Sequence, residues 1–147
     1  MSRITTLLAQ MTLEEKVGQL VQLSGEFFVD EPQLTVGPKA KLGISQQQVQ
    51  CAGSVLNVSG AIKTRHIQEQ HLQNSRLKIP LLFMADIVYG YRTVFPIPLA
   101  LGCSWSPTLI ERCCQVAAKE AVSAGSHVTF APMADLVRDA RWGRCME

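Results

Sequence analysis

Charged side chains are concentrated in residues 135–144, close to the end of the 147-residue sequence. This segment reads Asp-Leu-Val-Arg-Asp-Ala-Arg-Trp-Gly-Arg, and it follows the apolar run 128–133. Carboxylates accept hydrogen bonds, and guanidinium groups donate them in a fixed planar pattern, so the two together suit a polar ligand. A strand that ends in a charged, Trp-bearing loop is typical of the ligand-binding end of a (β/α) barrel.

A second apolar run ends in the same way. Residues 79–85 are followed by Asp86, and Gly90 and Arg92 come shortly after it. If both apolar runs are parallel strands of one sheet, their carboxyl ends lie at the same edge, where open α/β sheets bind ligands. The sequence therefore predicts that Asp86 and the loop after Met133 lie at the same end of the sheet.

Three apolar runs predict the strands: residues 55–57, 79–85 and 128–133. The run 79–85 is continuous rather than alternating, which is typical of a strand covered on both faces. Residues 24–44 contain several Gly and Pro, so we expect an irregular connection there, with a short helix after Ser45.

Helix patterns lie before and between these strands. Thr12 stands three residues before a Glu, the spacing of a capping box. The apolar residues that follow recur on one helical face, at Leu13, Val17, Leu20 and Val21. Residues 61–73 favour a second helix, and a third has Ser106 as its cap, Pro107 in its first position and Gly125 at its end. Strands that alternate with helices predict parallel βαβ units.

Composition argues against several classes of protein. The 14 basic and 12 acidic residues form no basic stripe, so no nucleic-acid partner is expected. No apolar stretch reaches the ~18 residues of a membrane span, and the N-terminus lacks the apolar core of a signal peptide. The five Cys lack metal-type spacing, and we expect reduced thiols in a cytoplasmic protein. No Gly-rich phosphate motif follows a strand, which argues against a dinucleotide-binding or P-loop fold. No cofactor and no metal are expected.

The two charged segments and four shorter ones resemble the N-terminal domain of glycoside hydrolase family 3, the β-glucosidase-like enzymes. The shorter segments are residues 11–20, 53–57, 118–121 and 130–133. The resemblance implies an α/β fold that is a partial (β/α)8 TIM barrel. Residues 1–147 are then its N-terminal segment, with an N-terminal helix and roughly the first three β/α units. A full barrel takes about 250 residues, so the rest of the barrel and the second domain are absent from this stretch.

The resemblance assigns substrate binding to three residues. In the family, the residues that match Asp86 and Arg144 hold hydroxyls of the same sugar, and a basic residue that matches Arg92 faces the same pocket. A carboxylate and a guanidinium suit neighbouring hydroxyls, because one accepts and the other donates charge-assisted hydrogen bonds. From the residues alone, Asp86 could instead cap a helix or loop, and Arg92 could form a salt bridge.

The rest of the loop is expected to shape the site rather than touch the ligand. Arg138, Asp139 and Arg141 are predicted to form an ion-pair cluster, and Trp142 is predicted to pack under the loop, with stacking on a sugar as the alternative. Ala140 stands where the family usually has Pro, which removes a fixed φ and loosens the loop. Two further departures from the family pattern are Tyr89 and Cys145.

The family resemblance also implies a function, exo-acting hydrolysis that releases β-linked glucosyl or related units by a retaining mechanism. That mechanism uses two carboxyl groups about 5 Å apart. In the family both lie downstream of the matched residues, so no catalytic residue is expected within residues 1–147. Asp135 and Asp139 are not an acid–base pair, because ion pairing with Arg138 and Arg141 keeps both ionised.

Two further functional alternatives remain. The chain could be a catalytically inactive truncated product, or a segment that folds only by assembly. A plain binding module is disfavoured because the sugar site is incomplete. The expected partner is a small carbohydrate, and neither nucleic acid nor membrane is expected. An open barrel also leaves an edge strand unpaired, where copies of the chain could associate.

Overall fold

The computed structural model describes residues 2–28 and 42–147, and its centre is a four-stranded parallel sheet. The strands are β1 (Gln22–Ser24), β2 (Ser54–Leu56), β3 (Leu82–Ala85) and β4 (Val128–Thr129). Each strand pairs in parallel with the next one along the chain. The predicted parallel α/β arrangement of the last three strands is therefore confirmed, and β1 extends it by one strand.

The segment before β1 differs from the prediction. Its capping box is confirmed, since the Glu15 amide donates to Thr12 Oγ1 (3.2 Å) and the Thr12 amide donates to Glu15 Oε2 (2.8 Å). The helix α2 (Leu13–Gly18) ends earlier than expected, however, and another helix, α1 (Arg3–Gln10), precedes it. The predicted apolar helix face is wrong, because Leu20 lies outside α2 and Leu13, Val17 and Leu20 are all exposed.

Helix α2 ends at Gly18 because the backbone carbonyls around this point accept hydrogen bonds from the residue that directly precedes β2. The Gly53 amide donates to the carbonyls of Gly18 (3.0 Å) and Val21 (3.2 Å), which draws residues 19–21 toward β2. The chain then enters β1, and a 3-10 turn, η1 (Gly25–Phe27), follows it. The irregular connection predicted over residues 24–44 falls mostly on residues 29–41, which lie outside the described residues.

The other helices occupy the expected places between strands. They are α4 (Gln46–Cys51), α5 (Ala61–Asn74), α6 (Pro98–Gly102) and α7 (Pro107–Ser123). The predicted helix after Ser45 is confirmed, with Ser45 and Gln48 forming a second capping box. The predicted cap of α7 is also confirmed, because Ser106 Oγ accepts from the Leu109 amide (3.4 Å).

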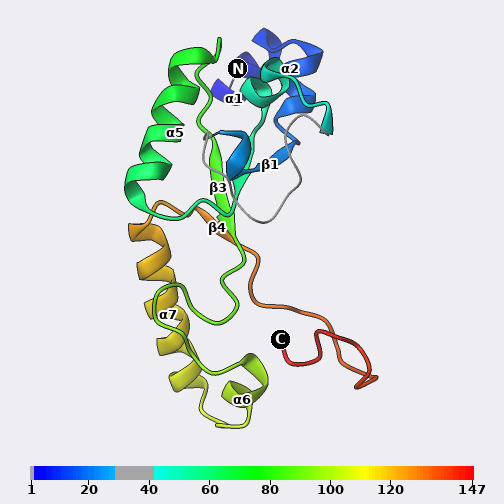
Figure 1. The fold of residues 1–147 in the computed structure, drawn as a ribbon, viewed down its shortest axis with the longest axis vertical. Helices are drawn as coiled ribbons and strands as arrows, with labels where there is room; N and C mark the ends of the chain where they lie inside the picture. Colours follow the sequence, from blue (N-terminus) through cyan, green and yellow to red (C-terminus); the bar gives the residue numbers. More distant parts are fainter. Residues whose placement is uncertain (1, 29–41) are drawn as a thin grey trace.

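The end of α7 packs against the start of α5, as Figure 1 shows. Thr64 Oγ1 donates to the Ala124 carbonyl (3.2 Å). Gly125 follows with φ of +94°, and a Cβ atom there would lie 2.6 Å from Thr64 Cγ2. Only glycine adopts this positive φ and leaves room for Thr64 at low cost, so the prediction that α7 ends at Gly125 is confirmed. The close contact at Gly125 also fixes α7 relative to α5.

The hydrophobic core lies between the sheet and its helices, in two clusters. The larger cluster joins β2 and β3 to α5, and it contains Val55, Val58, Ile67, Leu81 and Phe83. The smaller cluster joins β1 to α4, and it contains Leu23, Phe27, Val49 and Ala52. These clusters lie on the helix side of the sheet and hold the strand ends at fixed positions.

The prediction that β3 is covered on both faces is wrong for this chain. Phe83 is 1% exposed, whereas its neighbour Leu82 is 48% exposed. Neighbouring side chains of a strand point to opposite faces, so α5 covers one face and the other is open. In a closed barrel that second face meets the side chains of further strands, which the described residues do not supply.

The last strand is shorter than the predicted run 128–133. The Phe130 amide still donates to the Ala85 carbonyl (3.2 Å), but the Ala131 amide turns to Thr129 Oγ1 (3.3 Å). Pro132 has no amide hydrogen to continue the ladder. Beyond this point the chain leads away from the sheet (Figure 1). In the described part of the chain, the far edge of β4 has no strand beside it.

Candidate sugar-binding site

The two charged segments meet at the carboxyl end of the sheet. Asp86 comes directly after β3, and residues 130–147 follow β4. Asp86 and Arg144 line the same hollow of about 560 Å³. The other lining residues are Val88, Tyr89, Gly90, Val94 and Glu147. The expectation that Asp86 and the loop after Met133 lie at the same end is met by this shared hollow.

The carboxylate of Asp86 is exposed and makes no hydrogen bond within the described part of the chain. A cap would accept a bond from a backbone amide, so Asp86 does not cap a loop or helix among these residues. Both carboxylate oxygens are therefore available to donors on a ligand. Substrate binding by Asp86 stays a prediction, and the geometry favours it over the capping alternative.

The guanidinium of Arg144 is held by Glu147. Arg144 Nε donates to Glu147 Oε2 (2.8 Å), and a second donor of the same guanidinium reaches the same oxygen. This bond raises the pKa of Arg144, and the charges of Glu147, Asp86 and Asp135 add to the effect. Arg144 is therefore firmly cationic, and the field of Asp86 reaches it. An ion pair at the protein surface contributes little to stability, so a ligand can replace Glu147 at low cost.

Arg92 is not brought into this hollow. Its side chain is exposed, and no carboxylate among the described residues lies within ion-pair distance of its guanidinium. Its backbone amide donates to Glu120 Oε2 (2.8 Å). The structure thus places Arg92 on the loop that carries Asp86 but outside the lining of the hollow, and its predicted role in substrate binding stays a prediction.

Glu120 is a residue of the site region that the sequence prediction missed. It lies on α7, and its carboxylate accepts three hydrogen bonds from the loop after β3. These bonds lower the pKa of Glu120, with the Thr93 hydroxyl contributing most. In the sequence Glu120 follows Cys113, Val116 and Ala117 at helical spacing. An acid in line with these apolar residues is the signal that could have pointed to a polar partner.

The predicted ion-pair cluster in the loop after β4 is confirmed in part. Arg141 Nε donates to Asp139 Oδ1 (3.0 Å), and a second Arg141 nitrogen lies 2.5 Å from Asp139 Oδ2. The Arg141 hydrogen bonds lower the pKa of Asp139, so this carboxyl is a poor general acid. Arg138 has no partner in the described part of the chain, and it takes no part in the pair.

An apolar hollow of about 580 Å³ lies beside the polar one. The inner face of α7 forms one wall, and residues 87–90, 126–129 and 131–133 form much of the rest. Cys113 and Ala121 are the buried residues of this helix face, whereas Val122 is 70% exposed. An apolar surface this open is suited to contact with more polypeptide rather than with water.

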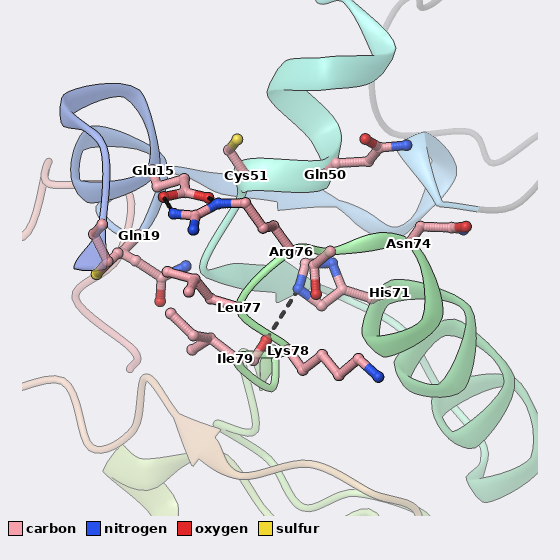
Figure 2. Close-up of a pocket in the computed structure, with 12 residues that line it drawn as sticks. Glu15, Gln19, Gln50, Cys51, His71, Asn74, Arg76, Leu77, Lys78 and Ile79 are labelled. Carbon is pink, nitrogen blue, oxygen red and sulfur yellow. Dashed lines mark hydrogen bonds and ion pairs between the residues drawn. The ribbon is translucent and has the colours of Figure 1, made fainter. Parts of the chain in front are cut away.

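A third hollow, of about 170 Å³, lies at the opposite end of the sheet (Figure 2). Its lining residues come from the segments that lead into β1, β2 and β3. Arg76 forms an ion pair with Glu15 (2.6 Å) and donates to the Gln10 carbonyl (2.8 Å). The opposite charges of Arg76 and Glu15 are therefore paired with each other within this hollow. Burial raises the pKa of the Cys51 thiol, which lowers its reactivity. These contacts tie the N-terminal helices to the segment before β3, and they indicate a structural role.

His71 lines this third hollow, and it makes stability depend on pH. Its Nε2 donates to the Ile79 carbonyl (3.1 Å), and its burial lowers the pKa below the ordinary value of 6.5. As the pH falls, His71 is therefore protonated in the unfolded chain before it is protonated in the folded chain. The stability from neutral His71 is complete above about pH 6.5 and is lost as the pH falls toward the folded-state pKa. We expect the free energy of unfolding of the wild type to be lower in acid. In His71→Gln the free energy of unfolding should depend less on pH.

The measurement is urea unfolding followed by circular dichroism at a pH of about 7.5 and about 5.5. His66→Gln is the matched control, because His66 is exposed on the same helix. The control should keep the pH dependence of the wild type. Equal pH dependence in the wild type and His71→Gln would contradict the prediction.

The described residues offer no arrangement for a metal ion, since they contain no suitable group of three or more His, Cys, Asp or Glu. All five cysteines lie in the described residues and are free thiols. No helix of residues 2–28 and 42–147 combines the length and apolar character needed to cross a membrane.

Comparison with known proteins adds to this geometry. The family profile described as "Glycosyl hydrolase family 3 N terminal domain" matches residues 12–147. The periplasmic beta-glucosidase of Salmonella typhimurium is 41% identical over 98% of this chain and 18% of its own length. A putative beta-xylosidase of Formosa agariphila is 33% identical over 99% of this chain and 20% of its own.

A solved structure has the same fold. The crystal structure of a beta-glucosidase from Listeria innocua in complex with isofagomine superposes with a TM-score of 0.87 and 48% sequence identity. It covers 100% of this chain, which in turn covers 20% of that protein. This chain therefore spans about a fifth of the length of the relatives that it matches.

Proposed function

The chain belongs to glycoside hydrolase family 3, and from this premise we propose that residues 1–147 are the N-terminal segment of the barrel domain of a β-glucosidase-type enzyme. The complete enzyme would release β-linked glucosyl or related units from the non-reducing end of a saccharide. Residues 1–147 would supply part of the subsite for that terminal sugar.

One observation carries this proposal. Asp86 and Arg144 come from different βα loops, and they line one hollow at the carboxyl end of a parallel sheet. Asp86 presents unbonded acceptor oxygens, and Arg144 presents a planar set of donors. A vicinal diol offers both a donor and an acceptor at each hydroxyl, so the pair can hold two neighbouring hydroxyls of one ring.

This binding would contribute to catalysis by orientation. In a retaining glycosidase a carboxylate attacks the anomeric carbon while a carboxylic acid protonates the leaving oxygen. The family resemblance puts both groups downstream of the matched residues. Asp86 and Arg144 would fix the sugar ring so that its anomeric carbon faces the two catalytic carboxyl groups. This orientation lowers the entropy cost of the attack. The crystal structures of the Listeria innocua beta-glucosidase with glucose and isofagomine support a monosaccharide-sized ligand.

A second candidate function has its own observation. The edge of β4 is unpaired in the described residues, and the apolar hollow beside α7 lies close to it. Copies of the 147-residue chain would associate through this surface, as unpaired strand edges do. The chain would then be an inactive, assembly-dependent segment. A cytoplasmic location stays a prediction beside either function, and the Salmonella relative is named a periplasmic enzyme.

A segment exchange tests the proposed function. Residues 1–147 replace the matching segment of the Listeria innocua beta-glucosidase, to which they are 48% identical. We expect the chimera to hydrolyse an aryl β-glucoside and the 147-residue chain alone to show no turnover. A folded chimera without turnover contradicts the sugar-site proposal. Turnover by the isolated chain that Asp86→Ala abolishes contradicts the placement of the catalytic groups downstream.

A further inference from the structure

We propose that Glu120 is a positioning residue of the sugar site, which acts by anchoring the loop after β3 to α7. The inference rests on the proposed function, because the loop in question carries Asp86. It goes beyond that function because Glu120 does not line the polar hollow and is not predicted to contact the ligand.

The anchor consists of one carboxylate and three donors. Glu120 Oε2 accepts from the backbone amides of Arg92 and Thr93, each at 2.8 Å. Glu120 Oε1 accepts from the Thr93 hydroxyl at 2.7 Å. All three distances are those of strong, charge-assisted hydrogen bonds. Both oxygens of the side chain are used, so the carboxylate is held in one orientation.

The anchored residues lie in a tight part of the loop. The Phe95 amide donates to the Tyr89 carbonyl (2.7 Å), which closes the chain on itself between these two residues. Gly90 has φ of +101°, and a Cβ atom there would lie 2.0 Å from the Thr93 carbonyl oxygen. Residues 89–95 are therefore a compact unit, and fixing Arg92 and Thr93 fixes the whole unit.

That unit forms part of the polar hollow. Tyr89, Gly90 and Val94 line the hollow together with Asp86, which precedes the unit by three residues. A second bond, between Tyr91 Oη and Ser59 Oγ (3.1 Å), ties the unit to the loop after β2. The loop thus has supports on two sides, and Glu120 is the one that comes from a helix.

The helix end that carries Glu120 is itself well fixed. Glu120 lies one turn before Ala124, whose carbonyl accepts from Thr64 of α5. Helix α5 in turn packs through Ile67 on the core of β2 and β3. The chain of contacts runs from the core through α5 and α7 to Glu120, and from there to the loop of the sugar site.

Substitutions at Glu120 separate geometry from charge. Glu120→Ala removes the anchor. Glu120→Gln can keep all three bonds, because its amide oxygen accepts from both backbone amides and its NH₂ donates to the Thr93 hydroxyl oxygen. Glu111→Ala is the matched control, because Glu111 lies on the exposed side of the same helix and bonds only Gln115 (3.0 Å).

The first readout uses the 147-residue chain and needs no activity. In amide-resolved NMR, Glu120→Ala should shift the Arg92 and Thr93 signals strongly and speed their hydrogen exchange, whereas Glu120→Gln and Glu111→Ala should leave the exchange slow. Fast exchange of both amides in the wild type overturns the anchor. So does unchanged exchange of both amides in Glu120→Ala.

The second readout is kcat/KM in the segment-exchanged beta-glucosidase. A misplaced binding group costs up to about a hundredfold, so we expect Glu120→Ala to lower kcat/KM at least about tenfold and Glu120→Gln to retain most of it. Wild-type kcat/KM in a folded Glu120→Ala chimera overturns the inference, and so does an equal loss in Glu120→Gln, which would mean that charge and not position matters. An inactive wild-type chimera refutes the proposed function instead, while the NMR readout still decides the anchor.

Discussion

Asp86→Ala and Arg144→Ala are each expected to lower kcat/KM of the complete enzyme about ten- to a hundredfold. Both side chains line the same hollow, and removing one partner of a charged hydrogen bond costs roughly 1.5–3 kcal/mol. Part of the loss should appear in kcat, because bonds to the sugar hydroxyls strengthen as the ring flattens toward the oxocarbenium-like transition state. Steady-state kinetics with an aryl β-glucoside gives both constants.

Arg141→Ala is the matched control for this pair. Arg141 lies three residues before Arg144 in the same loop, carries the same charge and is bonded to Asp139 rather than lining the hollow. It should keep kcat/KM close to the wild-type value. Circular dichroism checks the fold of each variant. If Asp86→Ala and Arg144→Ala are folded and keep wild-type kcat/KM, the two residues are structural and the sugar-site assignment is wrong.

Phe83→Ala is expected to destabilise the 147-residue chain by about 3–5 kcal/mol, the usual cost of truncating a buried aromatic side chain. Phe83 is 1% exposed and lies in the cluster that joins β3 to α5. Its ring also meets the His127 imidazole edge-on, with ring centres 5.7 Å apart. The loss comes from the apolar area returned to water and from the cavity left behind. Urea unfolding followed by circular dichroism measures it as a change in the midpoint.

Leu82→Ala provides the comparison within the same strand. Leu82 is 48% exposed on the opposite face of β3, so its truncation should cost under about 1 kcal/mol. A large loss in Leu82→Ala, similar to that in Phe83→Ala, would show that the open face of the sheet is covered in solution. Self-association of the chain is the arrangement that would cover it.

The parts of the fold that the sequence predicted correctly depend on local signals. Ser45 and Ser106 are cap residues whose side chains bond amides within the next turn, so the helix start is encoded within four residues. Gly125 ends α7 for an equally local reason, its positive φ. The strands β2 and β3 lie in short apolar runs between such signals. Their parallel order followed from the helices between them.

The parts that were missed depend on residues distant in the sequence. Gln22–Ser24 is too short for a recognisable alternation, and it is a strand because Ser54–Leu56 pairs with it. Leu13 and Val17 have helical spacing, but no element of the described chain covers them. Periodicity predicts which face of a helix is apolar, but burial needs a partner, and here the partner is not among residues 2–28 and 42–147.

In the candidate site too, the residues marked by local motifs were predicted and the residue with distant partners was missed. Asp86 and Arg144 were identified from motifs, and strand order alone was enough to bring them together. Glu120 was missed as a site residue because its partners, Arg92 and Thr93, are 28 and 27 residues away, respectively, and two of the three bonds come from backbone amides. A backbone amide has no residue type, so no motif marks it as the partner of a distant carboxylate.

The strand order β1-β2-β3-β4 has a consequence for how the chain is made. Each strand pairs with the one synthesised just before it, so no strand has to wait for a distant partner to leave the ribosome. During translation the chain leaves the ribosome N-terminal end first, at about 5–20 residues per second. The sheet can therefore grow outward one strand at a time, with the newest strand always at its edge. The unpaired edge of β4 is then the growing edge, onto which the next strand of a longer polypeptide would add.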